Sequence, residues 1–264
     1  MTKVRKEGKS TKEGYNTTDL NPETTFERSV FHRDQFAHFL RWTHVLKEAR
    51  IGDSVVDFGA GKCNLLEVLY RNRFKPSKYV ALEYKESEMA KAREKYANLP
   101  FPAEFIQQDI IKPTLNLDEL QADRVVSFEV AEHVGRQNVP TFLENFKRCG
   151  KDTARFYLST PNYDPEVGAA GNHTYDSGDG RGVAPQELDH FELQQMILDA
   201  GFEIENKFGT FASQRDYKGS LNDWQQKMFE AISKYYDSNL VSNLMAPVVE
   251  PELARNTLWV LKKK

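Results

Sequence analysis

The chain has 264 residues, of which 39% are hydrophobic and 12% aromatic, enough for one α/β domain with embellishments or at most two small domains. A net charge of −3 gives no global field that favours a polyanion, and two cysteines exclude a disulfide framework or a zinc-knuckle spacing. The charged N-terminus has no apolar signal-peptide core and no apolar run is long enough to span a bilayer, so we expect a soluble, cytoplasmic protein without a membrane partner.

Two segments precede the first expected strand. Residues 1–24 are polar with several basic residues, and we expect a flexible basic arm, either a solvated tail or an arm that orders over a site or touches phosphates. Residues 26–50 carry a helical pattern. Its histidines, His32, His38 and His44, recur every six residues and do not share one helix face, which argues against a three-histidine metal site.

From residue 54 the chain alternates between strand and helix patterns, which predicts an α/β fold with a doubly wound, mostly parallel sheet in residues 25–264. We expect strands at 54–58, 78–83, 103–108, 123–128, 154–159, 202–208 and 256–262, and helices at 62–73, 86–97, 137–149 and 186–200. A helical, aromatic-rich segment at about 219–246 reads as an insertion before the last strand, covering a substrate above the carboxyl edge of the sheet.

A glycine-rich turn follows the first expected strand. Apolar residues lead into Asp57, Gly59 and Gly61 stand at alternate positions, and a helix pattern begins shortly after. Glycines let a ligand approach the backbone, and a helix N-terminus offers unpaired N–H groups, so this turn predicts a nucleotide-type cofactor site. Asn64 stands where a third glycine would complete a dinucleotide fingerprint, which lowers the odds of a nicotinamide or flavin cofactor.

Acidic residues also end the second and third expected strands. Glu83, followed by Tyr84, is placed to accept hydrogen bonds from ribose hydroxyls, and Asp109 is placed to reach an exocyclic purine amine, with Ile110 against the ring. Because the carboxyl ends of parallel strands line one crevice, the three strand ends together point to a nucleoside cofactor.

These motifs resemble the class I S-adenosylmethionine-dependent methyltransferases. The likeness rests on residues 57–61, Glu83, Asp109 and residues 127–130, and covers about residues 50–210 plus the last strand. It implies a Rossmann-like seven-stranded sheet with an antiparallel last strand. It also implies S-adenosylmethionine as cofactor, and the cofactor-binding residues that we predict are Asp57, Gly59, Gly61, Glu83, Tyr84, Asp109, Ile110 and Glu129.

The run from Glu129 to His133 suggests a metal. If a helix starts there, Glu129, Glu132 and His133 share one face, and His190 further on supplies a fourth ligand. Such a Glu/Glu/His/His set suits Mg²⁺, Mn²⁺, Zn²⁺ or Fe²⁺. In the alternative without metal, Glu129 approaches the cofactor, His133 caps or packs, and Asp189 caps a helix beside a packing His190.

The same motif resembles two metal-using groups, the small-RNA 3′-terminal 2′-O-methyltransferases and the O-methyltransferases of ubiquinone biosynthesis. Residues 160–163, Thr-Pro-Asn-Tyr, and His190-Phe191-Glu192 extend the likeness to the RNA group, whose accessory nucleic-acid domains have no visible counterpart. The 160–163 segment also approaches the amine-holding motif of DNA methyltransferases, but it follows the fifth strand rather than the fourth and lacks the second proline. We therefore interpret it as a turn.

We expect an enzyme that transfers a methyl group to an oxygen, assisted by a divalent metal or by His133 or His190 as general base. The expected acceptor is a small hydroxylated molecule or a nucleotide, with an RNA 3′ end as the alternative. A methyltransferase-like protein that binds without catalysis is the alternative of a different class. The Gly-rich loop 168–182 is expected to be a surface loop or a lid. The oligomeric state stays open.

Overall fold

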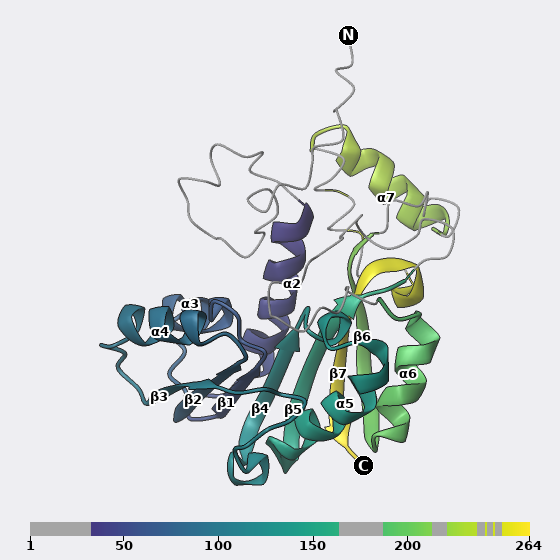
Figure 1. Ribbon diagram of the computed structural model, residues 1–264. Coiled ribbons are helices and arrows are strands. Elements are labelled where there is room, and N and C mark those ends of the chain that lie inside the picture. Colours follow the sequence, from purple (N-terminus) through teal and green to yellow (C-terminus); the bar gives the residue numbers. More distant parts are fainter. Residues whose placement is uncertain (1–32, 164–186, 213–220, 237–240, 242–244, 246–249) are drawn as a thin grey trace.

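A computed structural model describes residues 33–163, 187–212, 221–236, 241, 245 and 250–264. The predicted arm, the first residues of the predicted helix at 26–50 and the Gly-rich loop lie outside the described residues. The described part forms a seven-stranded sheet with the order β3-β2-β1-β4-β5-β7-β6 (Figure 1). Only β7 runs antiparallel to its neighbours β5 and β6. The predicted Rossmann-like sheet with an antiparallel last strand is therefore confirmed.

The strands and helices lie close to the predicted ranges. The strands are β1 Ser54–Phe58, β2 Lys78–Glu83, β3 Ala103–Gln107, β4 Ala122–Phe128, β5 Gly150–Pro161, β6 Phe202–Ala212 and β7 Ala254–Lys263. The helices are α2 Arg33–Glu48, α3 Asn64–Arg71, α4 Glu86–Lys95, α5 Val139–Arg148, α6 His190–Asp199 and α7 Asp223–Ser233. Within the described residues, none of these helices is long and apolar enough to cross a membrane.

Local chemistry explains where two helices start later than predicted. Cys63 has a left-handed φ of 57°, so α3 begins only at Asn64. The Asp189 carboxylate accepts hydrogen bonds from the backbone N–H groups of Phe191 and Glu192, so α6 begins at His190. Of the predicted insertion at 219–246, the described part contains α7, which lies on the side of the sheet where β1 to β5 end (Figure 1).

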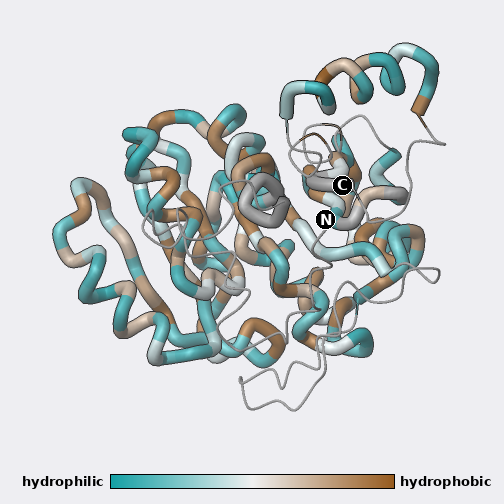
Figure 2. The backbone as a smooth tube through the Cα atoms, turned by 90° about the horizontal axis from the view of Figure 1, so that it is seen from above, coloured by the Kyte–Doolittle hydropathy of each residue, from teal (hydrophilic) through white to brown (hydrophobic). Residues whose placement is uncertain are grey.

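Side chains alternate between the two faces of the sheet, as the pleat of a strand requires. In β1, Val56 and Phe58 point to the face covered by α5 and α6, which we call the α6 face. Val55 points to the opposite face, which we call the α2 face and which α2, α3 and α4 cover. Along these helices, hydrophilic and hydrophobic stretches alternate, as amphipathic helices on a sheet require (Figure 2).

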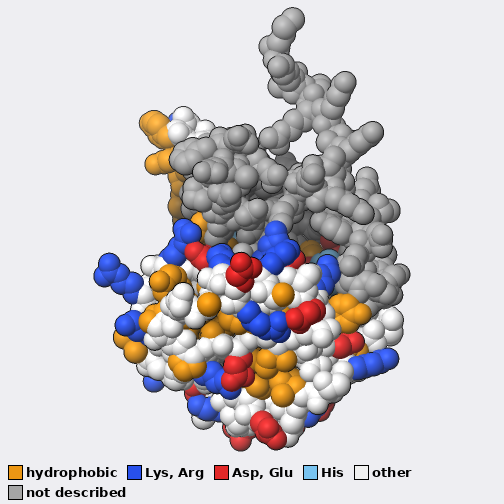
Figure 3. Space-filling view, turned by 60° about the vertical axis from the view of Figure 1, so that its left-hand side comes forward, with side chains coloured by type: hydrophobic (Ala, Val, Ile, Leu, Met, Phe, Trp, Pro, Cys, Tyr) orange, Lys and Arg blue, Asp and Glu red, His pale blue; other side chains and the backbone are white. Residues whose placement is uncertain are grey.

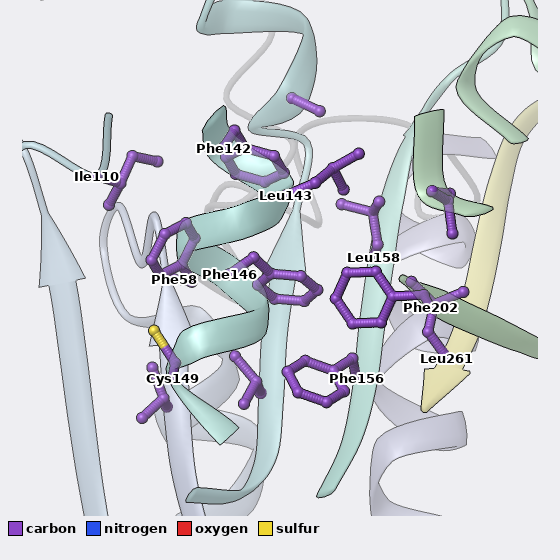
Figure 4. Close-up of a cluster of buried hydrophobic side chains, with 14 of the residues drawn as sticks. Phe58, Ile110, Phe142, Leu143, Phe146, Cys149, Phe156, Leu158, Phe202 and Leu261 are labelled. Carbon is purple, nitrogen blue, oxygen red and sulfur yellow. The ribbon is translucent and has the colours of Figure 1, made fainter. Parts of the chain in front are cut away.

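The core of the α6 face contains a group of phenylalanine rings in contact with one another. Phe146 lies at its centre, with ring centroids 5.7 Å from Phe58, 5.9 Å from Phe142 and 5.3 Å from Phe156 (Figure 4). Each such buried ring contributes roughly 1.5–3 kcal/mol by removal of apolar area from water. This packing fixes α5 against the sheet and so positions the segment between β4 and α5.

Candidate active site

The glycine-rich turn leaves the end of β1 in a strained but well-bonded conformation. The backbone N–H groups of Gly59 and Ala60 both donate to the Leu82 carbonyl, at 2.8 and 3.0 Å. Gly59 has a φ of +87°, and an added Cβ would lie 2.6 Å from Val130 Cγ2. Gly61 has a φ of +51°, but an added Cβ would meet no atom within 4 Å. The first glycine therefore serves backbone packing, whereas the second leaves open space beside the turn.

Glu83 is fixed at the end of β2 next to this turn. Its Oε2 accepts a hydrogen bond of 2.9 Å from the Gly61 backbone N–H, and its Oε1 accepts one of 3.0 Å from the Lys85 N–H. Two backbone donors thus hold the carboxylate in one orientation. Since a carboxylate has about four acceptor positions, both oxygens can still accept from a diol.

Asp57 lies beneath the turn and is buried on the α2 face. The Tyr79 hydroxyl donates to Asp57 Oδ2 at 2.6 Å. Burial raises the pKa of Asp57 to about 7, against the opposing Tyr79 hydrogen bond and with a further contribution from the Glu83 charge. Burial also raises the pKa of the Cys63 thiol, which makes it an unreactive packing group. Asp57 therefore supports the turn from below.

The third strand end is also preorganised. Asp109 Oδ1 accepts from the backbone N–H groups of Ile111 and Lys112, at 2.8 and 3.3 Å, which closes a tight turn after β3. The Ile110 side chain is buried in the core of the α6 face, and its carbonyl accepts from Asn145 Nδ2. The Tyr84 carbonyl accepts from Gln107 Nε2, at 3.3 Å. Contacts of these residues with an adenine stay predictions.

Glu129, directly after β4, has a left-handed backbone, as does Cys63 in the glycine-rich turn. The φ of Glu129 is +58°, and its carboxylate receives donors from three elements. Arg41 Nη1 of α2 donates to Oε1 at 2.5 Å, Ser159 Oγ of β5 donates to Oε1 at 2.9 Å, and Asn256 Nδ2 of β7 donates to Oε2 at 2.5 Å. Our sequence reasoning missed Arg41 and Asn256, because nothing in their local patterns sets them apart from other helix and strand residues.

Glu132 and His133 lie in a single 3₁₀ turn, Ala131–His133, rather than in the helix expected to start at Glu129. The left-handed Glu129 interrupts the helical path, so the predicted common face does not form. Thr160 Oγ1 donates to Glu132 Oε2 at 3.0 Å. Burial, then the nearby Glu129 charge, hold the pKa of Glu132 well above its ordinary value. His133 Nε2 lies 3.8 Å from Glu132 Oε1, and its side chain is 38% exposed.

His190 is enclosed in the α6 face. Its ring stacks on Trp259 with centroids 4.6 Å apart, and its Nδ1 lies 3.3 Å from Thr257 Oγ1. Lys207 Nζ lies 3.4 Å from its Nε2. Burial, then the Lys207 charge, lower the pKa of His190 to about 4, so the ring is neutral at physiological pH. This environment favours the alternative in which Asp189 caps α6 and His190 packs beside it.

The predicted metal ligands are not assembled into a site. Within the ranges that the structure describes, no group of three or more His, Cys, Asp or Glu side chains is arranged to hold a metal ion. The partners explain the division: Glu129 contacts Ser159, whereas Glu132 contacts the next residue of β5, Thr160. Adjacent strand residues point to opposite faces, so the set is split across the sheet. The donors do not fit a metal, and we derive no step through one.

The Thr160–Tyr163 segment ends β5 and joins it to β7. Asn162 Nδ2 donates to the carbonyls of Pro251 and Ala254, at 3.0 and 2.9 Å, and to Thr257 Oγ1 at 2.9 Å. The N–H groups of this amide thus already have acceptors inside the protein. The segment is therefore the end of β5 followed by a β-bridge from Asn162 to Leu188, and the turn that we predicted there is wrong.

Comparison with solved structures supports the fold. A *Mesorhizobium loti* S-adenosylmethionine-dependent methyltransferase is similar with a TM-score of 0.58 and 15% identity, covering 88% of this chain and 100% of that chain. A *Haloferax volcanii* chain, from a complex with the Trm112 methyltransferase activator, is similar with a TM-score of 0.54 and 18% identity over 87% of this chain and 90% of that chain. The [4+2]-cyclase SpnF is similar with a TM-score of 0.54 and 12% identity over 84% of this chain and 79% of that chain. At these identities the likeness shows the fold alone.

Comparison of sequences identifies the family. A probable S-adenosylmethionine-dependent methyltransferase of *Mycolicibacterium smegmatis* is 27% identical over 135 residues, which are 50% of this chain and 46% of that protein. The chain thus matches less than half the length of this curated relative. The family model described as a methyltransferase domain matches residues 31–207, more than half of the chain. The chain therefore belongs to the S-adenosylmethionine-dependent methyltransferase family, as its motifs predicted.

Proposed function

We propose that this protein transfers the methyl group of S-adenosylmethionine to an oxygen atom of a small hydroxylated molecule or a nucleotide. The observation that carries the proposal is the Glu83 carboxylate, held by the N–H groups of Gly61 and Lys85 beside the glycine turn. A fixed diol acceptor next to open space at Gly61 suits the ribose of the cofactor. Asp109, on the neighbouring strand end, is the proposed partner of the adenine amine.

S-adenosylmethionine supplies an electrophilic methyl group on a sulfonium, so the protein needs to align the acceptor rather than to form a covalent intermediate. Gly59 and Gly61 leave room for the amino-acid end of the cofactor, and Glu129 lies after the adjacent strand β4. The polar ends of β1, β2 and β4 thus surround the place where the methyl group is expected.

His133 is the better candidate of the two predicted general bases. Its half-exposed ring lies at the carboxyl edge of the sheet, 3.8 Å from the Glu132 carboxylate, which can orient it. His190 is buried and its pKa is lowered to about 4, so it is a poor proton acceptor at neutral pH. We therefore propose His133 as the group that removes the proton of the acceptor hydroxyl.

Charge supports a small acceptor rather than a polyanion. On the face shown in Figure 3, Lys and Arg side chains are interspersed with Asp and Glu. Exposed cations of the described residues are also paired with acids, as in Lys78–Glu104 at 2.8 Å and Arg93–Glu86 at 2.6 Å. Binding of nucleic acid depends on uncompensated cations, which this face does not gather. The two buried, unpaired cysteines agree with a reducing compartment such as the cytoplasm.

The proposal is tested with S-adenosylmethionine labelled in the methyl group, incubated with the protein and with panels of phenols, vicinal diols, nucleosides and short RNAs. We expect label transfer to a small hydroxylated acceptor, lost in His133→Ala, with an affinity that depends little on salt. A steep salt dependence and transfer to RNA would instead establish the RNA 3′-end alternative. Absence of binding to S-adenosylmethionine and S-adenosylhomocysteine would favour the non-catalytic alternative.

A further inference from the structure

Side chains from three different elements hold the Glu129 carboxylate. Arg41, Ser159 and Asn256 each donate to it, from α2, β5 and β7 respectively, and its own backbone N–H donates to the Ser159 carbonyl at 2.9 Å. A left-handed backbone costs a non-glycine residue roughly 1–2 kcal/mol. Strain of this kind persists only where the surroundings overdetermine it, and it clusters at functional sites.

Arg41 is an unusual residue for the helix that precedes the first strand. Its side chain is 2% exposed, its Nη2 lies 2.6 Å from His38 Nδ1, and its Nη1 contacts Glu129. Its Nε is buried and has no hydrogen-bond partner in the part of the chain that the structure describes. A buried ion pair contributes little to stability compared with apolar side chains of the same volume. The pair therefore makes sense as a device that fixes the carboxylate.

Donors from the described residues leave one acceptor position of this carboxylate unused. Three of its roughly four acceptor positions are taken by the three donors. The Glu129 side chain is 27% exposed whereas that of Arg41 is 2% exposed, so an incoming group meets the carboxylate and not the guanidinium. The next residue, Val130, packs against Gly59, which places this position beside the glycine turn.

We infer that Arg41 and Asn256 are positioning residues, which hold Glu129 so that its remaining acceptor position receives the ammonium group of the amino-acid end of the cofactor. The inference rests on the proposed function, since it concerns the same cofactor. Arg41 and Asn256 act through Glu129 and do not touch the ligand themselves. They hold the glutamate side chain in the binding orientation before the ligand arrives. A free side chain would lose conformational entropy when it adopted that orientation.

Two ligands separate this role from a general effect on folding. S-adenosylhomocysteine and 5′-methylthioadenosine share the adenosine and the thioether, but only the first carries the amino-acid end. In calorimetric titrations we expect Arg41→Met and Asn256→Leu to weaken S-adenosylhomocysteine binding about tenfold, as for loss of one hydrogen bond to a charged group. Both variants should bind 5′-methylthioadenosine as the wild type does. Asn256→Leu keeps the test available if Arg41→Met does not fold.

Arg124→Met is the matched control, because Arg124 is also a buried arginine in an ion pair, with Asp53 at 2.9 Å, but at the start of β4. It should leave the ratio of the two affinities unchanged. In a Glu129→Ala background, Arg41→Met should cause no further loss of S-adenosylhomocysteine binding.

Equal weakening of both ligands by Arg41→Met and Asn256→Leu would overturn the inference. The same holds if Arg41→Met has its full effect without the Glu129 carboxylate. If the wild type binds neither ligand, the proposed function itself fails, and that result is distinct from the first two.

Discussion

The polar residues near the carboxyl edge of the sheet have different surroundings on its two faces. On the α2 face, Asp57, Glu83 and Glu129 are carboxylates whose donors are fixed by backbone or by other elements. On the α6 face, His190 is neutral, stacked on Trp259 and enclosed by α6. Because adjacent strand residues point to opposite faces, a shift of one residue along a strand moves a side chain from one of these environments to the other.

This difference explains why the four predicted metal ligands do not form one group within the described residues. Sequence spacing places Glu129, Glu132 and His190 near one sheet edge, but the edge has two sides. On the α2 face, Glu129 accepts hydrogen bonds from Arg41 and Asn256. On the α6 face, His190 contacts Thr257. A shared edge is thus weaker evidence for a common site than a shared face.

The largest effect that we expect is the pH dependence of the free energy of unfolding that arises from Asp57 on the α2 face. Its pKa is raised to about 7 in the folded protein, so the folded state binds a proton that the unfolded state has lost. The stability from this group is full below about pH 4 and is lost as pH rises to 7, by about 4 kcal/mol. Asp57→Asn should remove this loss. Denaturant titrations at pH 4 and pH 8 measure it, and identical pH profiles for variant and wild type would contradict it.

His190 should show the opposite slope. Its pKa is lowered to about 4, so the folded state resists protonation. Its stability contribution is full above about pH 6.5 and is lost as pH falls to 4, by about 3 kcal/mol. His190→Gln should flatten this acid limb in denaturant titrations and leave S-adenosylhomocysteine affinity unchanged. A large loss of that affinity without a change in stability would return His190 to the active site.

A smaller effect on stability is expected at the two glycines of the turn, where each substitution serves as the control for the other. Gly59→Ala meets both a left-handed backbone and the Val130 methyl groups, whereas Gly61→Ala meets only the backbone cost. We expect Gly59→Ala to destabilise the protein by about 2 kcal/mol more than Gly61→Ala, measured by urea unfolding. Adding Val130→Ala to Gly59→Ala should recover most of the difference. Equal destabilisation by the two glycine variants would contradict the proposed contact between Val130 and a Cβ atom at position 59.

The approximate strand and helix ranges were predictable because alternating apolar runs and turn residues are local signals, whereas the antiparallel last strand was implied by the family resemblance. Glu83 and the glycine turn were predictable for the same reason, since each residue sits at a strand end. The clamp around Glu129 was not predictable. Asn256 lies 127 residues from Glu129 in the chain, and Arg41 lies 88 residues from it. Only the folded sheet brings such distant donors to one carboxylate, and no local sequence pattern predicts them.

The central claim is that the α2-face carboxylates at the strand ends bind an adenosyl cofactor through Glu83. Calorimetric titration of the wild type and of Glu83→Ala with S-adenosylhomocysteine tests it most directly, with Glu104→Ala as control, a partly exposed glutamate on the neighbouring strand β3. We predict one molecule bound per chain. Affinity should fall about 10- to 100-fold in Glu83→Ala and stay unchanged in Glu104→Ala, measured under conditions in which all three proteins are fully folded. Equal affinity in Glu83→Ala and wild type, or no binding by either, would contradict the account.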